Sequence, residues 1–181
     1  MPKRFILALV LSLFAGAVSA DFKSASDYEK PWKDFEREFE ADKPWVEIAA
    51  QLPPYPKDEN LLPFFVSSAN SNRHFVDGAS ISIGEDGVVH YSVVIKASGG
   101  AVNVSFEGMR CGTRERKLYA FGRPDGTWAR ARDSAWRGVP ARSVMAYARA
   151  LYDESFCPEG VRVRNVEEAV DHLRRGTTEK Y

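Results

Sequence analysis

Apolar and polar residues alternate through the middle of the chain, which is the pattern of β-strands with one buried face. The alternation is clearest over 79–83 and 88–96, two runs separated by Glu85-Asp86-Gly87. A three-residue loop with Gly87 in the left-handed conformation pairs Ile83 with Val89 and keeps the apolar positions on one face. A two-residue turn would mix the two faces, so the longer loop is predicted.

Two further turns extend this hairpin into a meander. A turn at Gly99-Gly100 is predicted to pair Ile95 with Val104. Arg123-Pro124-Asp125-Gly126 also predicts a turn, because Pro presets φ and Gly tolerates the left-handed region. We therefore expect five antiparallel strands, the last two near 115–121 and 127–132, with 64–67 able to add an edge strand.

Helical spacing returns after the strands. Pro140 suits the first position of a helix, and the stripe Val144, Tyr147, Ala148 and Leu151 predicts a helix that ends near Asp153. A second helix is predicted to begin at Asn165, which resembles the first residue of a capping box, and to stop near Gly176. Both helices should cover the sheet.

The residues before the strands are rich in proline and acidic side chains. Trp32, Phe35 and Phe39 recur at helical spacing, and Pro44 favours another turn or two of helix over 45–51. Pro53-Pro54-Tyr55-Pro56 then requires an extended path. The overall prediction is an α+β fold: an antiparallel sheet of about five to six strands, packed on one face by C-terminal helices, with a short helical N-terminal arm.

The start of the chain has the features of a secretory signal peptide. Lys3 and Arg4 precede an apolar run over 5–18, and Val18-Ser19-Ala20 forms a small-residue cleavage site. The run is shorter than the roughly 20 residues of a transmembrane helix, so we expect cleavage rather than a membrane anchor. The predicted organisation is a signal peptide at 1–20, an acidic arm at 21–59 and one domain at 60–181, in a periplasmic protein.

The two cysteines predict a covalent contribution to stability. Cys111 and Cys157 lack the CxxC spacing of redox or metal sites, and an oxidising compartment lets two thiols pair. We expect one structural disulfide, whose large loop predicts roughly 4 kcal/mol of stabilisation in the chain-entropy model. The formal net charge of 0 argues against bulk binding of nucleic acid.

Several ordered motifs carry a family resemblance. They are Phe75-Val76-Asp77-Gly78-Ala79-Ser80, Asp86-Gly87-Val88-Val89-His90-Tyr91, Asn103-Val104-Ser105-Phe106-Glu107-Gly108-Met109-Arg110-Cys111, Lys117-Leu118-Tyr119-Ala120-Phe121-Gly122 and Asp125-Gly126-Thr127-Trp128. In these motifs the chain resembles the cryptic neisserial protein family. The resemblance implies a bacterial, periplasmic protein without an established activity or assigned catalytic residues. Arg is usual in that family at the position of His90, which weighs against a fixed acid–base role there.

One set of polar residues has the composition of a catalytic triad. In the predicted register Ser82, His90 and Glu107 share the polar face of three adjacent strands. A sheet with one wet face carries such residues anyway, and the chain lacks the strained nucleophile turn of GxSxG enzymes. Catalysis by these three residues is therefore the weaker hypothesis, and no spacing indicates a metal or a cofactor.

Basic residues concentrate in the second half of the chain, where 106–150 carries ten basic and four acidic residues. Arg binds carboxylates and phosphates with two parallel hydrogen bonds and stacks on aromatic rings. The candidate binding residues are Arg130, Arg132, Trp128, Tyr119 and Arg110. An anionic envelope component or an acidic protein segment would suit them. Equally, the acidic arm could fold back on this region and neutralise it.

Three functional hypotheses follow. The leading one is a non-enzymatic binding or envelope-associated module that uses the Arg and aromatic surface. The alternative is a small periplasmic hydrolase that works from the polar face around His90. A third is an assembly role of the N-terminal arm.

Overall fold

The computed structural model of the chain describes residues 44–139 and 146–178. The predicted signal peptide and the predicted helix at Trp32, Phe35 and Phe39 lie outside these residues. So do Pro140 and Val144, with which the first C-terminal helix was expected to begin. All contacts reported below are made within 45–139 and 146–178.

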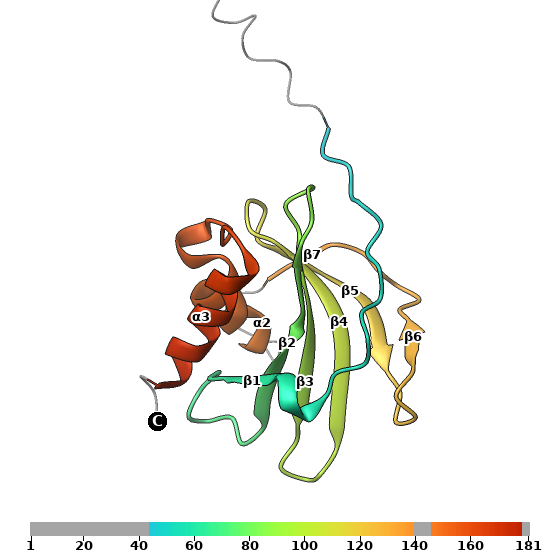
Figure 1. The fold of residues 1–181 in the computed structure, drawn as a ribbon, viewed down its shortest axis with the longest axis vertical. Coiled ribbons are helices and arrows are strands. Elements are labelled where there is room, and N and C mark those ends of the chain that lie inside the picture. Colours follow the sequence, from blue (N-terminus) through green and yellow to red (C-terminus); the bar gives the residue numbers. More distant parts are fainter. Residues whose placement is uncertain (1–43, 140–145, 179–181) are drawn as a thin grey trace, which may run out of the picture. The chain divides into compact units, whose positions relative to one another are not determined.

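Within the described residues, seven antiparallel strands form one sheet (Figure 1). The strands are β1 (Leu61–Phe64), β2 (Arg73–Ile83), β3 (Val89–Lys96), β4 (Val102–Arg110), β5 (Glu115–Gly122), β6 (Trp128–Arg130) and β7 (Arg137–Gly138). They are ordered β1-β2-β3-β4-β5-β6, and β7 also pairs with β5. The α+β prediction is confirmed, with an edge strand slightly earlier than expected and one short strand, β7, that was not predicted.

Three hairpin loops have the same construction. Gly87, Gly100 and Gly126 have positive φ angles of 80°, 89° and 79°, and each is the last residue of a three-residue loop. Such a loop is closed, for example, by the hydrogen bond from Gly84 N to Val88 O at 2.9 Å. The predicted pairing of Ile83 with Val89 is therefore confirmed.

The register predicted for the second hairpin was wrong by one residue. Ala97 N donates to Ala101 O at 2.8 Å, so the loop holds three residues rather than Gly99-Gly100. Ile95 consequently lies opposite Asn103, and Val104 lies opposite Val94. Because side chains alternate between faces, this shift moves every side chain of β4 to the face opposite the predicted one.

The C-terminal helices cover one face of the sheet (Figure 1). α2 (Ala146–Ala150) continues into a π-helical stretch over Leu151–Phe156, three residues beyond the predicted end, and α3 spans Val166–Thr178. The side chain of Asn165 caps α3 as predicted, because its Oδ1 accepts from Glu168 N at 2.9 Å. The core between the layers contains Val76, Val89, Tyr91, Val93, Met109, Leu151, Phe156 and Leu173.

The predicted disulfide joins Cys111, directly after β4, to Cys157, directly after the π-helical stretch. Both cysteines are buried in the core, and their Cα atoms are 5.4 Å apart. The bond therefore ties the helical layer to the sheet.

Residues 45–58, here called the strap, lead into the sheet without regular structure until the 3-10 turn Asp58–Asn60. The turn or two of helix expected over 45–51 is thus wrong. Local propensity is overridden by long-range contacts. Figure 1 shows the strap in cyan running along the sheet, and side chains of the strap contact β4, β5 and β6.

Candidate functional site

The sheet face opposite the helices, here called the strap face, is aromatic. Backbone alternation places His90 of β3 and Phe106 of β4 on it, beside Tyr119 of β5 and Trp128 of β6. The ring of Phe106 lies 5.6 Å from that of Tyr119 and 6.2 Å from that of Trp128. These rings form a continuous apolar floor beneath the strap.

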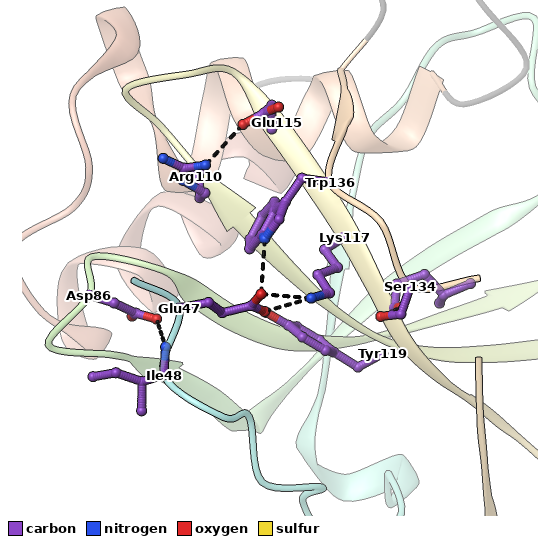
Figure 2. A network of polar contacts seen from close by, with 10 residues as sticks. Glu47, Ile48, Asp86, Arg110, Glu115, Lys117, Tyr119, Ser134 and Trp136 are labelled. Carbon is purple, nitrogen blue, oxygen red and sulfur yellow. Dashed lines mark hydrogen bonds and ion pairs between the residues drawn. The ribbon is translucent and has the colours of Figure 1, made fainter. Parts of the chain in front are cut away.

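The N-terminal half of the strap inserts one carboxylate into a set of three donors, here called the carboxylate clamp (Figure 2). Lys117 Nζ lies 2.9 and 2.7 Å from the two oxygens of Glu47. Tyr119 Oη donates to Glu47 Oε1 at 2.9 Å, and Trp136 Nε1 donates to Oε2 at 3.2 Å. The clamp thus uses both oxygens of the carboxylate.

The clamp favours the ionised form of Glu47. Partial burial alone would raise the pKa of this carboxyl, but the hydrogen bonds from Lys117, Tyr119 and Trp136 outweigh it and hold the pKa below its ordinary value. Burial raises the pKa of Tyr119 strongly, and its hydrogen bond to Glu47 adds to this effect. Tyr119 therefore acts as a neutral hydroxyl donor.

Contacts on both sides of Glu47 fix the backbone of the strap. Ile48 N donates to Asp86 Oδ2 and Trp45 Nε1 donates to Asp86 O, both at 2.8 Å. The guanidinium of Arg110 stacks 3.6 Å from the ring centroid of Trp45, and it also pairs with Glu115 at 3.1 Å. The stacking of Arg on an indole is a cation–π contact.

The C-terminal half of the strap makes a second set of contacts, centred on Trp128 and Gly122 and here called the Trp128 groove. Trp128 Nε1 donates to Pro53 O at 2.9 Å, and the ring of Tyr55 lies 5.4 Å from that of Trp128. Tyr55 Oη donates to Arg123 O at 3.0 Å. A Cβ atom placed on Gly122 would lie 2.8 Å from the ring of Tyr55, so the groove depends on glycine at that position.

Three of the five predicted binding residues meet on the strap face. Tyr119 belongs to the clamp, Trp128 to the groove, and Arg110 stacks on Trp45. Arg130 and Arg132 are exposed on and just after β6. Alternation along β6 places Arg130 on the same face as Trp128, and Arg132 follows two residues later.

Sequence reasoning did not bring Glu47 and Trp136 together, although the two residues meet in the clamp. They lie 89 positions apart, and such a pair can be found only once the strap has been placed on the sheet. A partial signal was available for Lys117, which stands two residues from Tyr119 in a strand. Alternation would have placed both on one face, although a bulge near this point complicates the pattern.

The proposed catalytic set is not brought together. Ser82 and His90 are opposite one another on β2 and β3, but Glu107 points to the helix side because the register of β4 differs from the predicted one. Glu107 is 1% exposed. Its carboxylate pairs with the guanidinium of Arg116 at 2.8 Å and accepts a hydrogen bond from Tyr147 Oη at 2.9 Å. His90 is also buried, and its Nε2 atom has no hydrogen-bond partner among the described residues. Burial lowers the pKa of His90, which disfavours its protonated form.

A cavity of about 370 Å³ lies on the helix side of β4 and β5, bordered by Glu107, Arg116, Phe121 and Tyr147. The carboxylate of Glu107 is already occupied there by Arg116, Tyr147 and Ser105. The polar floor of this cavity is thus engaged in internal contacts, in contrast to the strap face, where the same kinds of groups bind a separate segment.

No group of three metal-binding side chains occurs in residues 44–139 and 146–178. The helices in those ranges are also too short or too polar to cross a bilayer. A model of the CNP1-like family matches residues 40–174, a range that includes the strap and both of its sub-sites. No curated protein and no solved structure was found to match the chain.

Proposed function

The chain belongs to the CNP1-like family, and we propose that its domain is a non-enzymatic periplasmic binding module that recognises an extended, acidic polypeptide segment on the strap face. The observation that carries this proposal is the convergence of Lys117, Tyr119 and Trp136 on the carboxylate of Glu47. Charge-assisted hydrogen bonds of this kind are the strong ones in recognition. The disulfide is compatible with an exported protein.

The strap is held in the manner of a bound peptide. It pairs with no strand of the described sheet. Its partners are mostly side chains, from Asp86, Lys96, β4, β5, β6 and the segment before β7, together with the backbone carbonyls of Asp86 and Arg123. Few backbone hydrogen bonds therefore need to break when the strap leaves. A segment from another polypeptide with the same chemistry can take its place.

The exposed cations extend the surface toward such a partner. Arg130 shares a face of β6 with Trp128 by alternation, Arg132 follows β6, and both are exposed with the strap in place. Exposed charges at the rim of a binding site mainly speed association with a partner of opposite charge. An acidic segment is thus favoured both by the clamp and by the rim.

The hydrolase alternative finds no support in the geometry. His90 and Glu107 lie on opposite faces of the sheet, so a reacting group cannot contact both.

A titration with the strap's own sequence tests the proposal. The full chain with Glu47→Ala releases the strap from the clamp, and a fluorescein-labelled peptide of residues 45–58 is added while anisotropy is recorded. We expect saturable binding to this variant, at least about tenfold tighter than to the wild type, in which the tethered strap competes at an effective concentration in the millimolar range.

Second substitutions in the Glu47→Ala chain assign the binding to the strap face. Lys117→Ala should lower the affinity for the peptide by about tenfold. The double substitution Arg130→Glu with Arg132→Glu should slow association of the peptide, most strongly at low salt. Arg164→Ala removes an exposed cation that pairs with Glu168 at α3 and should change nothing. Absence of saturable binding to a folded Glu47→Ala chain, or equal effects of Lys117→Ala and Arg164→Ala, would refute the proposal.

A further inference from the structure

The exposure of the strap repeats every three residues. Gln51, Pro54 and Lys57 are exposed, whereas Glu47, Ala50, Pro53 and Pro56 are partly buried. A polyproline II helix has three residues per turn, so one edge of such a helix contacts a surface at every third position. The three prolines at 53, 54 and 56 favour the same conformation.

The Trp128 groove has the chemistry that recognises this conformation. A polyproline II segment makes no internal hydrogen bonds, so its carbonyl oxygens are available to an outside donor. Trp128 Nε1 supplies that donor to Pro53 O at 2.9 Å, above a floor that includes Phe106. An aromatic groove with an indole N–H aimed at a proline carbonyl is a general way to bind proline-rich segments.

The groove and the clamp together define a spacing. Glu47 and Pro53 are six residues apart, which corresponds to about 19 Å in a polyproline II helix at 3.1 Å per residue. A ligand that fills both sub-sites must carry its carboxylate at this distance before its prolines. A flexible acidic segment without prolines would have to lose more conformational entropy to do so.

We infer that the partner of this domain is a polypeptide with an acidic residue six positions before a Pro-Pro-x-Pro sequence, bound as a polyproline II helix with its prolines over Trp128. This inference rests on the proposed binding function and names the class of its ligand. The strap is the copy of that ligand within the chain, and it competes with the partner for the strap face. The partner binds tightly only when it displaces the tethered strap, which makes the strap an internal competitor.

The affinities of three peptides distinguish the contribution of the clamp from that of the Trp128 groove. The full chain with Glu47→Ala and Tyr55→Ala is titrated with residues 45–58, with the same peptide carrying alanine for Pro53, Pro54 and Pro56, and with the peptide carrying Glu47→Gln. The indole N–H signal of Trp128, assigned by its loss in Trp128→Phe, is followed by NMR. We expect the first peptide to shift this signal and the proline-free peptide to bind at least about tenfold more weakly.

The outcomes distinguish this inference from the proposed function. Equal affinity of the proline-free and natural peptides, with weaker binding of the Glu47→Gln peptide, would overturn the inference and leave acidic-segment binding intact. If none of the three peptides binds saturably, both the inference and the proposed function are overturned. In the Trp128→Phe chain the preference for prolines should fall to less than about twofold, and a preference that survives there would also overturn the inference.

The oligomeric state of the Glu47→Ala, Tyr55→Ala chain provides a further test. Light scattering should show a monomer before and after peptide addition. A dimer that excludes the peptide would assign the strap face to the strap of a second copy, and it would overturn a proline-containing partner of different sequence.

Discussion

Glu47 Oε2 lies 2.7 Å from Lys117 Nζ, although 70 positions separate the two residues along the chain. Both side chains are partly buried, with exposed fractions of 24% for Glu47 and 15% for Lys117. The pair therefore holds the strap at one defined place on the sheet. Its strength decides how readily the strap face opens to another segment.

The first prediction concerns the stability that this pair contributes. Glu47→Gln should lower the free energy of unfolding by about 1–2 kcal/mol near neutral pH, because charge-assisted hydrogen bonds to partly buried donors are lost. The pKa of Glu47 is lowered in the folded state, so this stability is present above the ordinary carboxyl value of 4.5 and is lost as the pH falls below it.

Urea unfolding at about pH 6 and about pH 3.5 checks both parts. The wild type should lose more stability between these two conditions than Glu47→Gln. Glu85→Gln at the exposed tip of the first hairpin is the matched control and should behave as the wild type. Equal losses in the wild type and in Glu47→Gln would contradict the lowered pKa of Glu47.

The second prediction concerns Gly122. A Cβ atom there would lie 2.7 Å from the Cβ atom of Val104 and 2.8 Å from the ring of Tyr55. Gly122→Ala should therefore cost about 1–3 kcal/mol and displace Tyr55 from Trp128, since overpacking shifts neighbouring groups. Gly138→Ala is the control, because a Cβ atom at Gly138 meets no atom of the described residues within 4 Å. Thermal unfolding and tryptophan fluorescence measure the two effects, and similar results for both variants would refute the close contact.

The third prediction concerns the buried pair Glu107 and Arg116 on the helix side. Arg116→Met should lower the free energy of unfolding by about 3–5 kcal/mol, because it leaves a buried carboxylate without its main counter-charge. Asp133→Asn breaks the pair of Asp133 with Arg137, which is two-thirds exposed, and should cost less than about 1 kcal/mol. Denaturant unfolding compares the two variants. A smaller loss for Arg116→Met than for Asp133→Asn would contradict the structural role of Glu107.

The fourth prediction concerns His90. His90→Phe keeps an aromatic ring against Phe106 and Tyr119, and it removes the Nε2 atom, which has no hydrogen-bond partner in the part of the chain that the structure describes. The substitution should therefore be neutral or stabilising by up to about 1 kcal/mol near pH 7. Burial lowers the pKa of His90 in the folded state. The unfolded chain therefore binds the additional proton, and the wild type loses stability as the pH falls below the ordinary histidine value of 6.5.

Unfolding at about pH 7.5 and about pH 5.5 tests this difference. Burial also lowers the pKa of His74, which is present in both chains and should contribute the same loss to each. The wild type should therefore lose more stability than His90→Phe. A variant that loses as much as the wild type would show that His90 is not held neutral.

The elements set by local chemistry were predictable from the sequence. Gly87 permits a three-residue loop, and the apolar residues on either side then leave one register that pairs Ile83 with Val89. Asn165 likewise marks the start of α3, because a side-chain cap acts within three residues. The pairing of Cys111 with Cys157 followed from their number and the expected compartment.

The second hairpin shows why the polar site was misplaced. Gly99 and Gly100 are adjacent, so the residues themselves do not decide between a two-residue and a three-residue loop. The two choices differ by one residue, and that difference decides whether Glu107 shares a face with His90. The actual register buries Glu107 beside Arg116, a pairing that needs α2 in place as well, because Tyr147 completes it.

The strap was less predictable because its contacts are distant in sequence. Pro44 favours a helical turn locally, but Trp45 and Glu47 gain more from the stacking on Arg110 and from the clamp than a short helix could supply. Propensity therefore loses to tertiary contacts. The same contacts make the strap face, rather than the exposed arginines alone, the centre of the candidate site.

Both margins of the sheet are poor templates for strand addition. The outer margin of β5 is divided between β6, with three residues, and β7, with two. At the other margin β1 has four residues, and Pro63 removes one backbone donor. Short edge strands of this kind disfavour edge-to-edge pairing with another chain. The proposed polypeptide partner is thus expected to bind across a face of the sheet rather than to add a strand at its edge.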